Sequence, residues 1–283
     1  VKMREFNILS LGAGVQSTAL YLMFMEGALK PALDYAIFAD TGEEPEAVYA
    51  HLAWVQSLGG PPILVRQKSR LGDDLVKGTN STGGRFASIP AFTAKEEGKP
   101  GGMVRRQCSK EYKIEVIERC IRRDIVGNKP RQRMPKDVKI VTSIGISLEE
   151  AGRAFRMKRN RERPWQELRF PLIDRAMTRA DCLNWMASRV PHRVMRSACV
   201  FCPYHSDSEW QCVKDNPKDW GRAVEIDCAL RTPGVAAARN LVSKLYLHRS
   251  CRPLEEVVFK PRNERELQLG LNFVSECEGV CGV

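Results

Sequence analysis

Five cysteines of this sequence stand at positions and spacings that suit thiolate chemistry. Cys199 and Cys202 form a Cys-x₂-Cys motif, a spacing that brings two thiolates to one metal ion. Cys108 opens a predicted helix, and Cys277 and Cys281 lie near the C-terminal end. In a cytosolic chain such a set favours zinc, an iron–sulfur cluster or redox chemistry over disulfides. Two incidental thiols are the alternative for the Cys-x₂-Cys motif.

The other cysteines lack such spacing, and we expect them to be core or surface residues. They are Cys120, Cys182, Cys212, Cys228 and Cys251. His205, beside the Cys-x₂-Cys motif, is expected to form a local hydrogen bond rather than to bind a metal.

A glycine-rich turn near the N-terminus is the second feature with chemical potential. An apolar run, Phe6 to Leu11, predicts a buried strand, and an apolar-periodic helix follows to about Leu29. Between them, backbone N–H groups and hydroxyls could wrap a phosphate chain at a positive helix end. The residues for this role are Ser10, Gly12, Gly14, Ser17 and Thr18. The turn matches neither the Walker motif nor the dinucleotide fingerprint, so a plain connector is the alternative.

Five further segments accompany this turn and together suggest a family. In chain order the six segments are Gly12–Ser17, Phe38–Glu46, Gln107–Ile114, Gly145–Arg153, Ala198–Tyr204 and Glu276–Gly282. Over nearly the whole chain they resemble the phosphoadenosine phosphosulfate (PAPS) reductase-like branch of the adenine nucleotide alpha-hydrolase, or PP-loop ATP pyrophosphatase, superfamily. The resemblance implies an α/β fold of the HUP-like type, with ATP or a related adenine nucleotide cleaved at the α-phosphate.

The same resemblance implies roles for residues at three strand ends. Asp40 and Thr41 would lie against the adenosine. Gly145 would lie at the end of another strand, beside the crevice that holds the nucleotide. Arg153 would stabilise the negative charge of the phosphates. Asp40-Thr41-Gly42 alone is ordinary turn chemistry, and Glu149 with Arg153 could be a surface ion pair. Gln16 stands where the ATP-cleaving loop usually carries Asp, which weakens a Mg²⁺-binding role for this position.

Sulfonucleotide reductases with a [4Fe-4S] cluster use a Cys-Cys pair and a later Cys-x₂-Cys. This chain has Gln107-Cys108 in place of the pair, so the resemblance implies only three ligands: Cys108, Cys199 and Cys202. The fourth could be Cys277 or Cys281, or an open iron could bind a sulfide for transfer. Glu276-Cys277 also resembles the start of the reductases' nucleophilic tail, without its His. Cys108, Arg153 and Cys277 are therefore the catalytic candidates, and Cys281 is the candidate fourth metal ligand.

The charge balance favours an anionic partner. Lys and Arg number 45 against 34 Asp and Glu, a net charge of +11. The cations cluster between Arg119 and Lys136 and again between Arg153 and Arg163, which favours a polynucleotide over a merely solvated face. No apolar run is long enough for a membrane span, and no signal peptide is recognisable, so we expect a cytoplasmic protein without membrane contact.

The elements that must position these residues alternate between strand and helix in the first half of the chain. This alternation predicts a parallel sheet with helices on both faces in residues 1–175 and a mainly helical, cysteine-containing region in residues 176–283. The long polar stretch from Gln67 to Arg106 is expected to be a loop, either a binding loop or an insertion. A capped helix is predicted to begin after Thr178.

Three functions are compatible with these features. The first is an ATP-dependent enzyme that adenylates a tRNA or DNA base and inserts sulfur with the help of an iron–sulfur cluster and a possible sulfur-donor protein. The second is a PAPS or adenosine phosphosulfate reductase, against which the altered tail and the incomplete Cys-Cys pair count. The third is a metal-stabilised nucleic-acid-binding module without catalysis, for which Gln16 is the main support.

Overall fold

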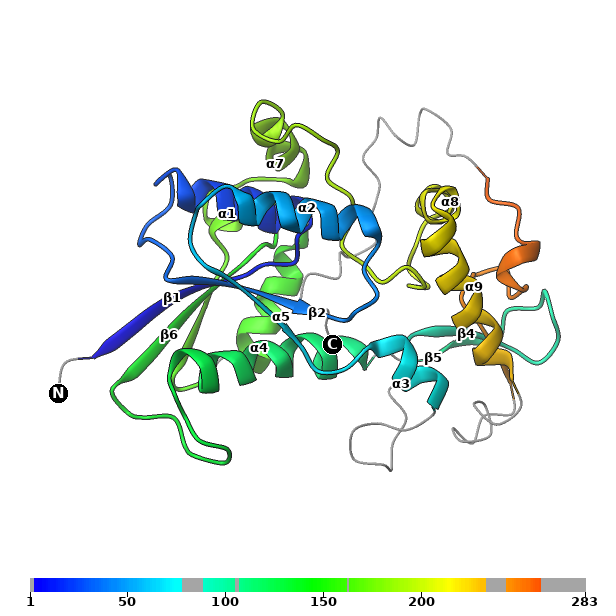
Figure 1. Ribbon diagram of the computed structural model, residues 1–283, viewed down its shortest axis with the longest axis horizontal. Helices are drawn as coiled ribbons and strands as arrows, with labels where there is room; N and C mark the ends of the chain where they lie inside the picture. The colour runs from blue at the N-terminus through cyan, green and yellow to red at the C-terminus, as the bar shows by residue number, and fades with distance from the viewer. Residues whose placement is uncertain (1–2, 78–88, 105–106, 162, 233–242, 261–283) are drawn as a thin grey trace.

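The computed structural model describes residues 3–77, 89–104, 107–161, 163–232 and 243–260. Its centre is a sheet of five parallel strands flanked by helices, as the alternating pattern predicted (Figure 1). The strands are β1 (Arg4–Ser10), β2 (Tyr35–Asp40), β3 (Ile63–Gln67), β6 (Val138–Ile144) and β7 (Gln166–Arg169). Their spatial order is β3-β2-β1-β6-β7.

Alternating side chains of the strands serve two separate cores. In β1, Leu9 faces the helices α1 (Val15–Met25), α2 (Glu46–Ser57) and α7 (Arg179–Met186). Ile8 faces the opposite layer, which holds α4 (Glu115–Cys120) and, further along the sheet, α5 (Ala151–Arg161). Because both faces are covered, the strands are apolar on both sides, which explains the continuous runs in the sequence.

The strand order creates a switch point at the carboxyl edge of the sheet. The chain passes from β1 outward to β2 and β3, and later returns to the other side of β1 with β6 and β7. The turns that follow β1 and β6 therefore diverge, and ligands of open α/β sheets bind in the crevice between such turns. Gly12 and Gly145 lie in these two turns.

The segment from Gln67 to Arg106 is not the loop that its composition predicted, because its described part contains α3 (Leu71–Lys77), β4 (Ala91–Ala94) and β5 (Gly102–Val104). An antiparallel sheet joins β5, β4 and β8 (Lys244–Tyr246). These strands are only three or four residues long. Their pairing depends on partners far away in the sequence, which no local pattern announces. This sheet therefore joins segments from both sides of residue 175, the boundary predicted between the two regions of the chain.

The helix predicted from Cys108 to Val126 is present but changes its winding. It runs through a π-helical turn η1 (Ser109–Ile114), then α4, then a second π-helical turn η2 (Ile121–Ile125). The capped helix predicted after Thr178 is α7, where Thr178 and Asp181 form a capping box.

Two further helices, α8 (Asp207–Asp215) and α9 (Pro217–Arg231), confirm the helices predicted in the last third. Within the described ranges, no helix combines the length and the apolar character that a membrane crossing requires.

Candidate nucleotide and thiol site

The turn after β1 has the geometry of an anion cradle. Gly14 is the N-cap of α1, no side chain caps this end, and the first turn holds no acidic residue. Ser17 Oγ accepts a hydrogen bond from Gly12 N at 3.1 Å and so fixes the loop. Ala13 has a φ of 57°, a left-handed conformation that costs a residue with a Cβ about 1 kcal/mol. The positive end of the helix dipole therefore lies beside a turn held in a strained conformation.

Gln16 connects this turn to the other side of the switch point. Its buried amide donates from Nε2 to Ser147 Oγ at 3.4 Å, just after Gly145, and its Oε1 accepts from Arg179 Nη1 at 3.1 Å. Gln16 thus holds the guanidinium of Arg179 beside the glycine turn. Arg179 was not among the residues expected at this site, since only the fold brings the start of α7 to the glycine turn.

Thr18, in the first turn of α1, is held by a histidine that the motifs did not indicate. Its Oγ1 lies 2.9 Å from His51 Nε2, and His51 Nδ1 lies 2.8 Å from His192 Nε2. Trp54 stacks on His51 with ring centroids 5.6 Å apart. Burial, followed by the neighbouring His192, lowers the pKa of His51 to about 4, so His51 is neutral at pH 7. Ser10, at the end of β1, is buried near this turn.

The loop after β2 is where the thiols meet the sheet. Asp40 Oδ1 accepts from Gly42 N at 2.7 Å and from the Tyr49 hydroxyl at 2.8 Å, so this carboxylate shapes its own turn. The buried hydroxyl of Thr41 lies 3.3 Å from Cys199 Sγ, and Val200 N donates to Glu43 O at 2.8 Å. The Cys-x₂-Cys segment therefore rests directly against the end of β2, beside the glycine turn of the adjacent strand β1.

The Cys-x₂-Cys segment is itself a tight turn, in which Cys202 N donates to Cys199 O at 2.8 Å. His205 Nε2 also donates to Cys199 O, at 3.0 Å, which confirms the local role predicted for this histidine. Burial, with the charge of Glu44 next, raises the pKa of the Cys199 thiol well above its ordinary value. Cys108 lies close enough to Cys199 to add to this shift.

The fit of these residues to a metal is incomplete. In the described ranges, no group of three or more His, Cys, Asp or Glu side chains is arranged to hold a metal ion. Cys277 and Cys281, the expected tail nucleophile and fourth ligand, lie outside the described residues. Cys120, Cys182 and Cys251 are buried, as expected for core residues. The described residues alone therefore do not form a cluster or zinc site.

A buried ion pair supports the thiol side of the crevice. Lys113 Nζ lies 3.2 Å from Glu44 Oε1, and both side chains are almost fully removed from solvent. Ser197 Oγ donates to the other oxygen of Glu44 at 3.0 Å. This pair joins the π-helical turn η1, the loop after β2 and the segment that leads to Cys199.

Arg153 is oriented by an acidic neighbour. Its Nη1 lies 2.6 Å from Glu150 Oε1, and its side chain is buried at the start of α5. The neighbouring Glu149 accepts a hydrogen bond at its Oε1 from Arg179 N at 2.8 Å. Glu149 therefore links the turn after β6 to the start of α7.

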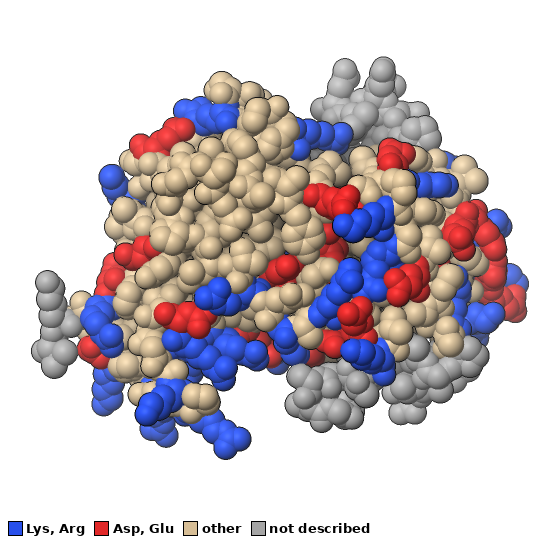
Figure 2. Space-filling model, viewed as in Figure 1, with Lys and Arg blue, Asp and Glu red and all other residues tan. Residues whose placement is uncertain are grey.

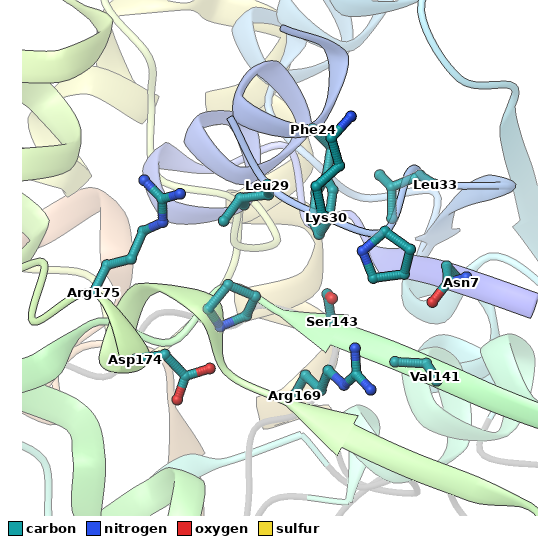
Figure 3. A pocket seen from close by; sticks show the side chains of 12 residues that line it. Asn7, Phe24, Leu29, Lys30, Leu33, Val141, Ser143, Arg169, Asp174 and Arg175 are labelled. Carbon is teal, nitrogen blue, oxygen red and sulfur yellow. The ribbon is translucent and has the colours of Figure 1, made fainter. Parts of the chain in front are cut away.

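A cavity of about 340 Å³ lies on the α1 side of the sheet, away from these residues (Figure 3). Asn7, Val141 and Ser143 form its floor, and the segment after α1 together with Arg169 and Arg175 forms its walls. Its lining includes none of the residues predicted to bind a nucleotide or a metal.

Comparison of the chain with models of protein families, with curated proteins and with solved structures gives no significant match.

Proposed function

We propose that this protein is an ATP-dependent sulfurtransferase that adenylates a base carbonyl oxygen in tRNA or DNA and replaces it with sulfur. The observation that carries the proposal is the 3.3 Å contact between Thr41 Oγ1 and Cys199 Sγ. This contact holds the Cys199 thiol at the end of β2, the strand that neighbours β1 and its glycine turn. A nucleotide phosphate at Gly12–Thr18 and a sulfur carried near Cys199 then face one substrate atom.

The two halves of the site divide the chemistry. The base oxygen attacks the α-phosphorus of ATP, and pyrophosphate leaves. The N-terminus of α1 and the guanidinium that Gln16 holds, Arg179, stabilise the charge on the phosphates. A persulfide on Cys199, formed by exchange with a persulfide-carrying donor, then attacks the activated carbon through its outer sulfur, and AMP leaves with the original oxygen. The second thiol of the Cys-x₂-Cys motif, Cys202, attacks the resulting carbon-bound disulfide at the Cys199 sulfur and releases the thiolated base. The Cys199–Cys202 disulfide that remains is reduced by an external thiol before the next turnover. Arg153, oriented by Glu150, is the second cation for the phosphates.

The iron–sulfur cluster, its zinc alternative and a Mg²⁺ ion that would accompany ATP stay predictions. Cys108, Cys199 and Cys202 are the described residues that would contribute to a metal centre, with the tail cysteines completing it. Such a centre would hold or supply the sulfide. Iron, sulfide and zinc contents after anaerobic purification test this, with Cys199→Ala as the variant and Cys212→Ala as a matched control outside the motif.

The proposed activity is tested with ATP labelled at the α-phosphate, offered together with bulk tRNA or genomic DNA. We expect AMP to form in a fixed ratio to thiolated product, which a mercury-containing gel retards. Arg179→Gln should lower AMP formation at least tenfold, the scale of one lost charge-assisted contact. Arg175→Gln, a control four residues earlier that lies outside the site, should leave it unchanged.

Other outcomes separate the competing functions. Release of sulfite from PAPS or adenosine phosphosulfate, without AMP formation from ATP, would instead support a sulfonucleotide reductase. Nucleic-acid binding without either reaction would reduce the protein to a binding module.

A further inference from the structure

Helix α5 exposes an aromatic ring on a face that is otherwise cationic. Arg153, Ala154 and Met157 are buried and fix the inner side of the helix. At 100° per residue, Phe155 then points almost directly outward, and its side chain is 70% exposed. Among the described residues with large exposed apolar side chains, Phe155 is the only aromatic one, and an exposed ring offers a face on which a planar group can stack.

Three cations surround this ring. Arg159 lies one helical turn further along the same outward side, and Arg156 and Lys158 flank it to either side. All three are exposed, and no carboxylate in the described ranges pairs with them. Gly152, one turn before Phe155, leaves the surface open, since a Cβ there would meet only Arg156 Nη1 at 3.8 Å. The ring face is therefore accessible and lies in a positive field.

The cationic surface continues beyond α5 onto the neighbouring helix. Arg163 follows α5, and its Nη2 lies 3.8 Å from Glu118 Oε1 of α4. Trp165 packs into the core beneath α4. From there a hollow of about 210 Å³ is lined by five cations and two carboxylates, namely Arg119, Arg122, Arg123, Lys129 and Arg131 with Glu115 and Glu118, so cations predominate. In Figure 2 this area, below α4 at the lower left, is predominantly blue. One flank of the molecule thus joins an aromatic ring to a long basic surface.

We propose that the outward face of α5 is a binding platform for single-stranded nucleic acid, in which Phe155 stacks on an unpaired base. Arg156, Lys158 and Arg159 hold the adjacent phosphates, and the strand continues over the basic hollow beside α4. The inference extends the proposed function, on which its biological meaning rests, by naming an unpaired strand as the form of the substrate. A single ring amid cations suits a base and its phosphates, whereas a membrane surface requires a wide apolar face.

Binding is measured by fluorescence anisotropy with labelled 15-mers of thymidine and of uridine and with a 15-base-pair duplex, without ATP. We expect both single strands to bind more tightly than the duplex. Phe155→Ala should weaken single-strand binding roughly 5- to 150-fold and should leave the salt dependence unchanged, because stacking releases no counterions. Phe155→Trp should retain the affinity, and Phe155→Leu, which keeps only the apolar character, should resemble the alanine variant.

The cations give a complementary signature. Arg156→Gln, Lys158→Gln and Arg159→Gln should each reduce the slope of log Kd against log salt by about 0.7. Val258→Ala, which removes an exposed apolar side chain elsewhere, is the control and should change neither quantity. A brominated uridine strand should crosslink on irradiation to the peptide that contains Phe155.

Unchanged affinity in Phe155→Ala, equal binding of duplex and single strand, or a crosslink at another peptide would each overturn the platform. The proposed function is judged separately by AMP formation from ATP. A protein that binds strands through Phe155 but cleaves no ATP retains the platform and loses the sulfurtransferase activity. A protein that cleaves ATP but binds strands equally well with and without the Phe155 ring retains the sulfurtransferase activity and loses the platform.

Discussion

The buried histidine of α2 should make the stability of this protein depend on pH in a defined way. His51 is 2% exposed, its two ring nitrogens face Thr18 and His192, and its pKa is lowered from 6.5 to about 4. The folded protein therefore resists protonating this ring, whereas the unfolded chain takes up the proton near pH 6.5. The stabilisation is complete above pH 6.5 and is lost progressively as the pH falls toward 4.

The size of the effect follows from the two pKa values. At about 1.36 kcal/mol per pH unit, the interval between 6.5 and about 4 corresponds to roughly 3 kcal/mol once the pH lies below both values. At pH 5 the linkage relation gives a loss of about 2 kcal/mol. This loss is a large part of the ~5–15 kcal/mol that is the typical free energy of unfolding of a domain, so unfolding experiments can measure it.

The assay compares urea unfolding at pH 7 and pH 5 for the native protein and for His51→Gln, whose amide cannot titrate in this range. The native protein should lose about 2 kcal/mol more than the variant between the two pH values. Subtraction removes the carboxylates, which titrate in both proteins. His192→Gln, a variant of the exposed partner, should keep most of the pH dependence because burial is the larger cause. Equal losses in the native protein and His51→Gln, or an NMR titration of His51 near 6.5, would refute the reasoning.

Three further predictions concern single positions, each checked by chemical or thermal unfolding. Lys113→Met should destabilise the protein by about 3–5 kcal/mol because it removes the cation that lies 3.2 Å from the buried carboxylate of Glu44, and adding Glu44→Gln should recover much of this loss. A loss below 1 kcal/mol would show that the pair is hydrated. Ala13→Gly should stabilise by about 1 kcal/mol, since glycine accepts the φ of 57° freely, whereas Ala13→Val should destabilise; the reverse order would mean that the turn is not left-handed. Arg131→Gly should likewise gain about 1 kcal/mol, because Arg131 has a φ of 66°, and should weaken strand binding about equally for all sequences; a variant that binds as tightly as the native protein would remove Arg131 from the nucleic-acid surface.

Local sequence patterns determined the scaffold around the glycine turn. The apolar run of β1 and the glycines after it predict the strand and its turn, because buried parallel strands and tight turns leave short-range signals. The helix after Thr178 and the one that begins near Cys108 were likewise readable from capping and periodicity. These features depend on neighbours a few residues apart, and the sequence contains them completely.

Tertiary structure alone decided which of these pieces meet. The short strands β4, β5 and β8 are stabilised by partners up to 154 residues away in register, since Phe92 pairs with Tyr246, and the polar edge strand β7 is stabilised by β6.

The candidate site, like the short strands, depends on contacts between residues that are far apart in the sequence. The contacts of Thr41 with Cys199 and of Gln16 with Arg179 join residues more than 150 positions apart. Such contacts arise from the order in which strands assemble into the sheet, and residue type and spacing cannot encode that order locally. The glycine turn and the Cys-x₂-Cys motif were therefore visible in the sequence, whereas the contributions of Arg179 and His51, and the assembly of all these residues at one edge of the sheet, are properties of the fold.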